Sequence, residues 1–236
     1  MAKLVQKSGY IKSGKASGYM RYIATREGVE KLAGNGAVTK GQRELIQKLL
    51  HDFPDAVELF EYEDYCKTPT LGTASAFITM ALDANLHEID SESGYMQYIA
   101  TRPRVQKHGS HGLFSSSTSV DLASAMSELE AHEGNVWTII YSLRREDADR
   151  LEFDNADAWR TLLMENAPTL AKSMKISLNN FHWYAAFHDE GHHPHIHMMV
   201  WSDDPKEGFL TKGGIAAMRS KLTNAIFRDE MQQIYE

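Results

Sequence analysis

Four stretches of the chain are rich in β-branched and aromatic residues, which is typical of β-strands. They are residues 3–8, 136–143, 181–188 and 195–201. The sequence Asp189-Glu190-Gly191, which follows the third stretch, is typical of a turn. Only an antiparallel hairpin tolerates so short a connection between paired strands. We therefore expect the last two strands to be neighbours in an antiparallel sheet.

Apolar residues at spacings of three and four predict helices elsewhere in the chain. The predicted helices cover residues 41–51, 71–86, 119–132, 145–152, 156–175 and 212–235. Strands and helices do not alternate strictly, so the pattern predicts an α+β fold, with helices packed on one central antiparallel sheet. Long loops are expected at 34–41 and 108–119, but no low-complexity linker divides the chain. We expect residues 1–236 to form a single domain. Because the last predicted helix runs to the end, we expect this domain to be the N-terminal part of a longer protein.

Three histidines fall where the last two predicted strands meet. Alternate residues of a strand share a face, so His195 and His197 project to the same side. His188 ends the preceding strand, and the turn can fold it back beside this pair. Neutral imidazole is a common ligand of divalent metals, and three such ligands leave positions open for water or substrate oxygen atoms. The pattern predicts a catalytic metal site on the central sheet.

The alternative is that these histidines are ordinary polar residues on a half-buried strand. However, five of the 11 histidines of the chain lie within residues 188–197. This clustering favours metal binding. His192 and His193 fall in the predicted turn, so we expect them not to be ligands.

A sequence of 15 residues occurs twice, as SGYMRYIATREGVEK from residue 17 and as SGYMQYIATRPRVQK from residue 93, with 11 identical positions. Two copies with an offset of 76 residues are too few and too distant for a solenoid. In the first copy, Tyr19 and Tyr22 are three residues apart and would share a face of a helix, and the second copy repeats this spacing. We interpret the repeat as one local device used twice.

Composition and charge limit the class of protein. Of the 236 residues, 42% are hydrophobic, which is enough for a substantial core. No stretch approaches the roughly 18 apolar residues that a membrane helix needs, and the single cysteine, Cys66, suits a reducing compartment. We expect a cytoplasmic protein without membrane insertion. The net charge is −7, but residues 1–48 carry +7, which favours a contact between this segment and a polyanion.

A metal open to oxygen ligands, a tyrosine and a basic segment together favour phosphoryl transfer. A tyrosine hydroxyl can attack a phosphodiester that a metal polarises, and it then stays covalently attached to phosphorus. The bond between tyrosine and phosphorus keeps the energy of the diester. A later hydroxyl can therefore attack it and reseal the nucleic-acid strand without ATP. A tyrosine has a pKa of about 10, so its phenolate needs a nearby cation. Arg21 and Arg26, which lie on either side of Tyr22, are candidates.

Five short strings extend along the chain from this tyrosine to the histidines. They are YIATREG from Tyr22, FEYEDY at 60–65, RPRVQKHGSHGLF at 102–114, NVWTIIYSLRRED at 135–147 and HDEGHHPHIH at 188–197. Together they resemble the P-type (MOBP) conjugative relaxases of the HUH endonuclease superfamily, and in particular relaxases of mobile elements from Gram-positive bacteria. The resemblance implies an enzyme that nicks one strand of single-stranded DNA at an origin of transfer. Such an enzyme stays bound to the 5′ end through a tyrosine and later rejoins the strand.

The resemblance also implies roles for individual residues and partners. By position in the family motifs, Tyr22 is the nucleophile, and the ligands of Mg²⁺ or Mn²⁺ are His188, His195 and His197. The cations of the basic segment that we expect to contact DNA are Lys12, Lys15, Arg21 and Arg26. Further expected partners are other relaxosome proteins and conjugation coupling proteins. The implied location is the bacterial cytoplasm, and transfer with the DNA into a recipient cell is left open.

The second copy of the repeat departs from the one-tyrosine pattern because it offers Tyr98. This tyrosine is followed by Pro103 and Arg104, where the first copy has Glu and Gly, so we interpret Tyr98 as structural, with a catalytic role as the alternative. Tyr19 is the nearest substitute for the predicted nucleophile. No acidic residue stands at a matching position to orient the histidines, and Asp189 is the candidate that we take.

Two other classes of protein fit part of the pattern. The string HPHIH at 193–197 also fits the H-x-H-x-H pattern of histidine-triad nucleotide hydrolases, in which a histidine is the nucleophile and no metal is needed. The repeated tyrosine element would have no use in such a protein. The other alternative is a non-enzymatic DNA-binding protein with a structural metal, although structural zinc sites normally have four ligands and favour cysteine. A covalent tyrosine–DNA adduct distinguishes the relaxase from both.

Overall fold

The computed structural model of the chain describes residues 3–10, 36–85, 96, 99–100, 105–107, 111–117, 119–189 and 193–228. The chain forms two compact units. One consists of residues 1–11 and 92–236, and the other consists of residues 12–91. In sequence, the second unit is therefore an insertion after the first strand. A single relaxase domain over all 236 residues stays a prediction.

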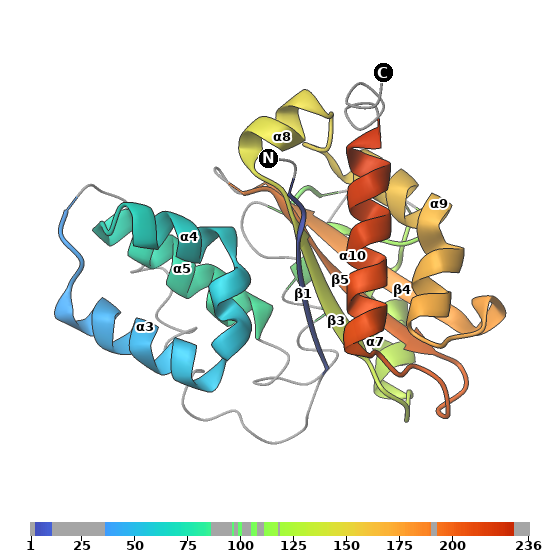
Figure 1. The fold of residues 1–236 in the computed structure, drawn as a ribbon. Helices are drawn as coiled ribbons and strands as arrows, with labels where there is room; N and C mark the ends of the chain where they lie inside the picture. The colour runs from blue at the N-terminus through green and yellow to red at the C-terminus, as the bar shows by residue number, and fades with distance from the viewer. Residues whose placement is uncertain are drawn as a thin grey trace. The chain divides into compact units, whose positions relative to one another are not determined.

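The first unit contains a five-stranded antiparallel sheet (Figure 1). Its strands are β1 (Val5–Tyr10), β2 (Leu113–Phe114), β3 (Trp137–Ser142), β4 (Phe181–His188) and β5 (His195–Ser202). Their order across the sheet is β1-β3-β5-β4-β2. All four predicted strands are present, and the antiparallel hairpin of β4 and β5 is confirmed. The strand β2 lies within a predicted loop, because two residues are too short to show a period of two.

Four helices and a 3₁₀ turn complete the description of this unit. They are α7 (Leu122–Glu130), α8 (Arg145–Arg150), α9 (Ala156–Ser173), η3 (Leu178–Asn180) and α10 (Lys212–Ile226). Polar caps set where the longer helices begin. Asn155 accepts a hydrogen bond from the backbone of Ala158 at the start of α9, and Thr211 does the same for Gly214 in α10. Each cap satisfies a backbone N–H that has no partner within its helix.

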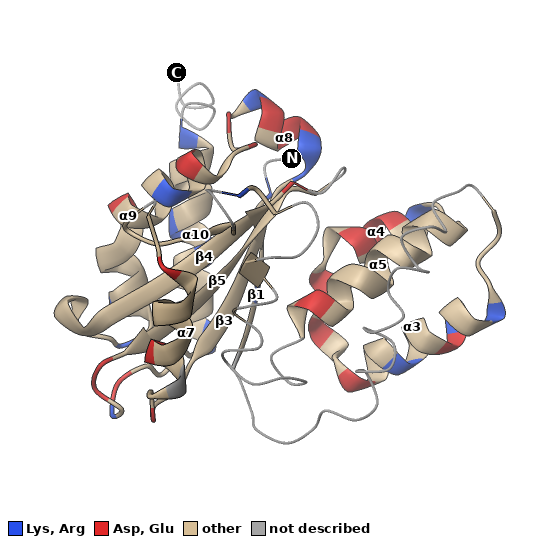
Figure 2. Cartoon of the chain, turned by 180° about the vertical axis from the view of Figure 1, so that it is seen from behind, with Lys and Arg blue, Asp and Glu red and all other residues tan. Residues whose placement is uncertain are grey.

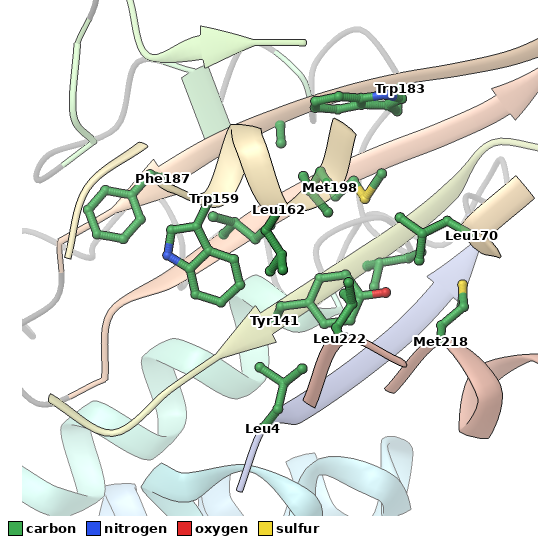
Figure 3. Packing of buried hydrophobic residues seen from close by; sticks show 14 of the residues in the cluster. Leu4, Tyr141, Trp159, Leu162, Leu170, Trp183, Phe187, Met198, Met218 and Leu222 are labelled. Atoms are coloured by element: carbon green, nitrogen blue, oxygen red, sulfur yellow. The ribbon is translucent and has the colours of Figure 1, made fainter. Parts of the chain in front are cut away.

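The hydrophobic core lies on one face of the sheet, under α9 and α10 (Figure 1). Tyr141 of β3 and Phe187 of β4 both lie directly opposite Ile196 of β5, so the three share this face. Figure 3 shows how Trp159 of α9 and Leu222 of α10 pack among such strand residues. The burial of these large apolar side chains fixes which face of the sheet is the core.

The other face carries the three histidines, and we call it the histidine face. Its strand residues are Val5, Lys7, Gly9, Leu113, Thr138, Ile140, Ser142, His182, Tyr184, Ala186, His188, His195, His197, Met199 and Trp201. Helix α7 lies on this face, away from α9 and α10 (Figure 2). The Tyr184 hydroxyl donates a hydrogen bond to Glu128 of α7 at 3.0 Å. Partial burial, the larger cause, and this hydrogen bond raise the pKa of Tyr184 to about 12.

Helices α9 and α10 cover one face of the antiparallel sheet and α7 lies on the other (Figure 2). The predicted α+β class, with helices packed on a central antiparallel sheet, is therefore confirmed.

The second unit is helical in its described part. Its elements are α3 (Lys40–Asp52), η1 (Pro54–Glu58), α4 (Phe60–Lys67) and α5 (Leu71–Ala84). Thr39 and Gln42 form a capping box at the start of α3, and Gln42 also donates to Ser75 of α5 at 2.9 Å. Helix α4 was not predicted because its eight residues include four charged ones and show no clear apolar face.

No helix among the described residues combines the length and the apolar character that crossing a membrane requires.

Candidate metal centre

The register of β4 and β5 brings the three predicted ligands together. His188 lies directly opposite His195, and His197 is two residues further along β5. Directly opposed residues of antiparallel strands point to the same face, so all three side chains project from the histidine face. Their ligand nitrogen atoms lie within 4.8 Å of one another. The convergence expected from the alternating pattern is therefore present.

The three rings form a compact triangle. Their centroids are 4.6 Å apart for His188 and His197, 5.1 Å for His195 and His197, and 5.2 Å for His188 and His195. None of these side chains is more than 1% exposed. Burial limits competition from water for the ring nitrogen atoms, so a bound ion would interact strongly with them.

Main-chain carbonyl groups hold two of the rings. His188 Nε2 lies 2.9 Å from the carbonyl oxygen of Ile99, and His195 Nδ1 lies 3.0 Å from that of His193. A carbonyl oxygen only accepts, so each ring donates its N–H at this position. In the neutral ring the lone pair then belongs to the other nitrogen, His188 Nδ1 or His195 Nε2, and both atoms are buried. Metal-binding histidines are oriented by such bonds from the nitrogen that does not bind the ion.

This donor set fits a divalent metal ion. With metal–nitrogen bonds of about 2.1 Å, two ligands at right angles are about 3 Å apart, so a bound ion would draw together nitrogen atoms that lie within 4.8 Å of one another. The group that could hold an ion contains three residues among those described. Three nitrogen ligands leave coordination positions open, as in catalytic sites, whereas structural zinc sites normally close with four ligands.

Described residues of the second copy of the repeat contact His188 and its strand. Val105 forms an antiparallel bridge with His188, and the backbone N–H of Gln106 donates to the carbonyl of Phe187 at 3.0 Å. Ile99, whose carbonyl accepts from His188, belongs to the same copy. These contacts tie the described residues of this copy to β4 and His188. The role of Tyr98 itself stays a prediction.

An ion pair lies directly after β4. Arg145, the first residue of α8, pairs with Asp189 and also with Asp149, the latter at 3.3 Å. Partial burial disfavours the charged guanidinium, but the hydrogen bonds to the two carboxylates outweigh it and raise the pKa of Arg145. The pair ties the start of the β4–β5 turn to α8. Asp189 is thus engaged with Arg145, while carbonyl groups orient two of the histidines.

The other predicted site residues fall outside the described residues. They are Lys12, Lys15, Tyr19, Arg21, Tyr22, Arg26 and Tyr98. Sequence reasoning also did not single out Lys7, which is 5% exposed and lies on the histidine face. Its position could be found only from the pairing of β1 with β3, which local patterning does not specify.

An α+β fold with three converging histidines on an antiparallel sheet is the arrangement expected of an HUH-like relaxase. The family model of the MobL relaxases matches residues 1–236, and the chain belongs to this family. No curated protein and no solved structure matches the chain. Membership supports a conjugative relaxase, a DNA-nicking enzyme that acts on single-stranded DNA at an origin of transfer, over a histidine-triad hydrolase or a non-enzymatic DNA-binding protein.

Proposed function

We propose that this protein nicks and rejoins one DNA strand at an origin of transfer by tyrosine transesterification that depends on a divalent metal. One observation carries the proposal: three buried histidines converge on the central sheet of a chain that matches the MobL relaxases from end to end. We further propose that it is a P-type relaxase from a mobile element of a Gram-positive bacterium. The strings around Tyr22 and around residues 188–197 support this assignment.

Tyr22 is the proposed nucleophile. Its hydroxyl oxygen attacks the phosphorus of the scissile phosphodiester as its proton leaves, and the bond between phosphorus and the 3′ oxygen breaks. The 3′ oxygen takes up a proton, and the 5′ phosphate stays on the tyrosine. Attack by a 3′ hydroxyl on this phosphotyrosine reverses the step and rejoins the strand. Arg21 and Arg26 stabilise the phenolate and the phosphate by their charge.

His188, His195 and His197 are the proposed ligands of one Mg²⁺ or Mn²⁺ ion. When bound, the ion would polarise a phosphate oxygen and offset charge at phosphorus. The all-imidazole set favours Mn²⁺, because Mg²⁺ prefers oxygen ligands. The protein's own contribution is to hold two of the rings through the carbonyl groups of Ile99 and His193.

The basic segment binds the DNA strand in this proposal. Lys12 and Lys15 act with the two arginines as phosphate contacts, while aromatic side chains stack on unpaired bases. Relaxosome proteins and a conjugation coupling protein are the further partners. The proposed location is the bacterial cytoplasm, with passage into the recipient cell alongside the DNA.

The nucleophile is tested with an oligonucleotide that carries the origin of transfer of the mobile element encoding the protein. Wild-type protein with Mn²⁺ should form a covalent adduct that survives denaturing electrophoresis, and EDTA should abolish it. Tyr22→Phe removes only a hydroxyl, so it should fold and bind DNA but lose at least about 1,000-fold in adduct formation, because the nucleophile is absent. Peptide mass spectrometry should locate the adduct at Tyr22.

Tyr98→Phe and Tyr19→Phe are the matched controls, since each removes the equivalent group from the same repeated element. Both should form the adduct at close to the wild-type rate. If the adduct persisted in Tyr22→Phe and disappeared in Tyr98→Phe, the nucleophile would be Tyr98 of the second copy and not Tyr22. No adduct with any protein in the series would contradict the proposed reaction.

A further inference from the structure

His111 is a buried histidine outside the proposed ligand set, and both of its ring nitrogen atoms form hydrogen bonds. It is 8% exposed. Its Nδ1 atom accepts from the backbone N–H of Leu113 at 3.1 Å, and its Nε2 atom lies 3.0 Å from the carbonyl oxygen of Val120. A carbonyl oxygen only accepts, so Nε2 carries the proton. A neutral imidazole has one donor and one acceptor, and His111 uses both.

These two bonds fix the backbone of residues 111–113. The bond to Leu113 closes a local turn around Gly112. The bond to Val120 ties this turn to the residue before Asp121, which caps helix α7. Leu113 begins β2 and pairs with Ala186 of β4. Because a buried polar ring is costly unless its nitrogen atoms are bonded, the ring holds the chain in this one conformation.

Residues 111–113 also contact the main chain that orients a proposed metal ligand. Gly112 donates its backbone N–H to the carbonyl of Ala100 at 2.8 Å. The carbonyl of the preceding residue, Ile99, accepts from the ring of His188 at 2.9 Å. The acceptors for Gly112 and for His188 are therefore carbonyl groups of adjacent residues. A shift of residues 111–113 would pull on the peptide that orients the His188 ring.

Resting on the proposed function and its metal site, we propose that His111 is a positioning residue for the histidine centre. Its neutral ring fixes Gly112, and Gly112 holds Ala100. The neighbouring carbonyl of Ile99 then keeps the Nε2 side of His188 occupied and leaves Nδ1 for the ion. The Nδ1 atom of His111 matters more than its Nε2 atom, because the bond from Leu113 to Nδ1 closes directly around Gly112.

His111→Asn and His111→Gln test this proposal as a matched pair that differs by one methylene group. The asparagine oxygen can take the place of Nδ1 and accept from Leu113. The longer glutamine side chain brings its amide to the place of Nε2, where it can donate to Val120 but leaves Leu113 without its acceptor. Without DNA, His111→Gln should bind Mn²⁺ about 10-fold more weakly than wild type, and His111→Asn should stay within about threefold.

The ring N–H of His188 gives a second readout, which a general loss of stability would not move alone. NMR of the metal-free protein with ¹⁵N-labelled histidine should show this proton in a hydrogen bond in wild type and in His111→Asn. In His111→Gln its signal should shift or be lost through exchange with water. The ring N–H of His195, which bonds to the carbonyl of His193, should stay unchanged in both variants.

His51→Gln is a further control, because His51 is exposed on α3 in the other unit, so the metal affinity and the His188 signal should both equal those of wild type. Calorimetric titration measures the affinity, and cooperative unfolding shows that each variant is folded. In cleavage of the origin oligonucleotide, the Mn²⁺ concentration for half-maximal adduct formation should rise about 10-fold in His111→Gln, in step with the affinity.

Three results bear on the proposal in different ways. If His111→Gln binds Mn²⁺ as tightly as wild type and leaves the His188 signal unchanged, His111 does not position the centre. If both variants are weakened equally, or neither folds, His111 is a structural residue and the proposal is wrong. If wild type forms no adduct with DNA, the proposed reaction fails, whereas a difference between the two variants in metal affinity and in the His188 signal would still support the positioning role.

Discussion

At the scale of single residues, His193 and His195 show how position decides a role. Both are buried, but His195 projects from the histidine face, whereas His193 supplies its main-chain carbonyl as the acceptor of the His195 ring. A side-chain substitution at His195 therefore removes a proposed ligand. A side-chain substitution at His193 keeps the main-chain carbonyl that supports the His195 ring. The two residues form a matched pair for testing the metal site.

We expect His195→Ala to lower Mn²⁺ affinity by more than about 100-fold, which exceeds the usual cost of losing a supporting contact. His193→Ala should stay within about threefold of wild type, because alanine keeps the carbonyl. Calorimetric titration of metal into the two variants measures the difference, and cooperative unfolding of both shows that the fold is intact. If His195→Ala bound Mn²⁺ as tightly as wild type, His195 would not be a metal ligand.

The sequence predicts that the three histidines converge, but it does not predict their surroundings. A strand period of two and a short turn were sufficient to bring His188, His195 and His197 together, because both are local properties. The acceptor of the His188 ring is the carbonyl of Ile99, and a main-chain group has no sequence signature. Lys7 joins the same face only through the pairing of β1 with β3, a distant contact that no local pattern specifies.

At the scale of elements, Val105 and Gln106, at the end of the second copy of the repeat, lie between β4 and Gly112 with little free space. Gly112 donates its backbone N–H to the carbonyl of Ala100 at 2.8 Å. A side chain at this position would meet the side chain of Val105 and come within 2.7 Å of the carbonyl oxygen of Gln106. Val105 pairs with His188 and Gln106 donates to Phe187, so a shift of these two residues away from the new side chain would disturb their pairing with β4. Glycine at 112 thus keeps the histidine centre supported.

Gly112→Ala should therefore destabilise the protein by about 1–3 kcal/mol, the usual cost of overpacking, and weaken Mn²⁺ binding. Gly213→Ala is the control, since only Thr211 Oγ1, at 3.8 Å, would lie near its new methyl group. In helix α10 that change should be neutral or stabilising by up to about 1 kcal/mol. Urea unfolding and a metal titration measure both effects. Equal stability and equal metal affinity in the two variants would contradict the supporting role.

The elements themselves were predictable in proportion to their length and periodicity. The eight-residue strands β4 and β5 and the helix α9 have many positions that agree with one period, so they were found close to their observed bounds. The two-residue strand β2 is defined only by its pairing with β4. The 3₁₀ turn η1 and helix α4 are short and polar, and their packing with α3 and α5 stabilises them.

At the scale of the whole molecule, charge is divided unevenly along the chain. The net charge is −7, while residues 1–48 carry +7. In the described part, acidic side chains gather along η1 and α4 (Figure 2). The net negative charge of the chain opposes binding to DNA, so the positive charge of residues 1–48 must outweigh it. Because both effects are electrostatic, the affinity for DNA should depend strongly on ionic strength.

If Lys12, Lys15, Arg21 and Arg26 each neutralise one phosphate, the log–log slope of affinity against salt is about −3. Affinity for the origin oligonucleotide should then fall by about 50-fold between roughly 50 and 200 mM salt. Fluorescence anisotropy measures it, and replacing the four cations with glutamine should flatten the dependence. If the affinity of the wild-type protein for the oligonucleotide did not change with salt, the four cations would not be phosphate contacts.

The pairing of β1 with β3 has a consequence for the making of the protein. Tyr10 is paired with Trp137 in the sheet, so β1 leaves the ribosome more than a hundred residues before its partner strand is synthesised. At about 5–20 residues per second that delay lasts for seconds. The unit of residues 12–91 has its whole chain before then and can fold first. The histidines of β5 follow later still, so a nascent chain has no assembled centre. The three histidines can converge only after the whole of β5 has been synthesised.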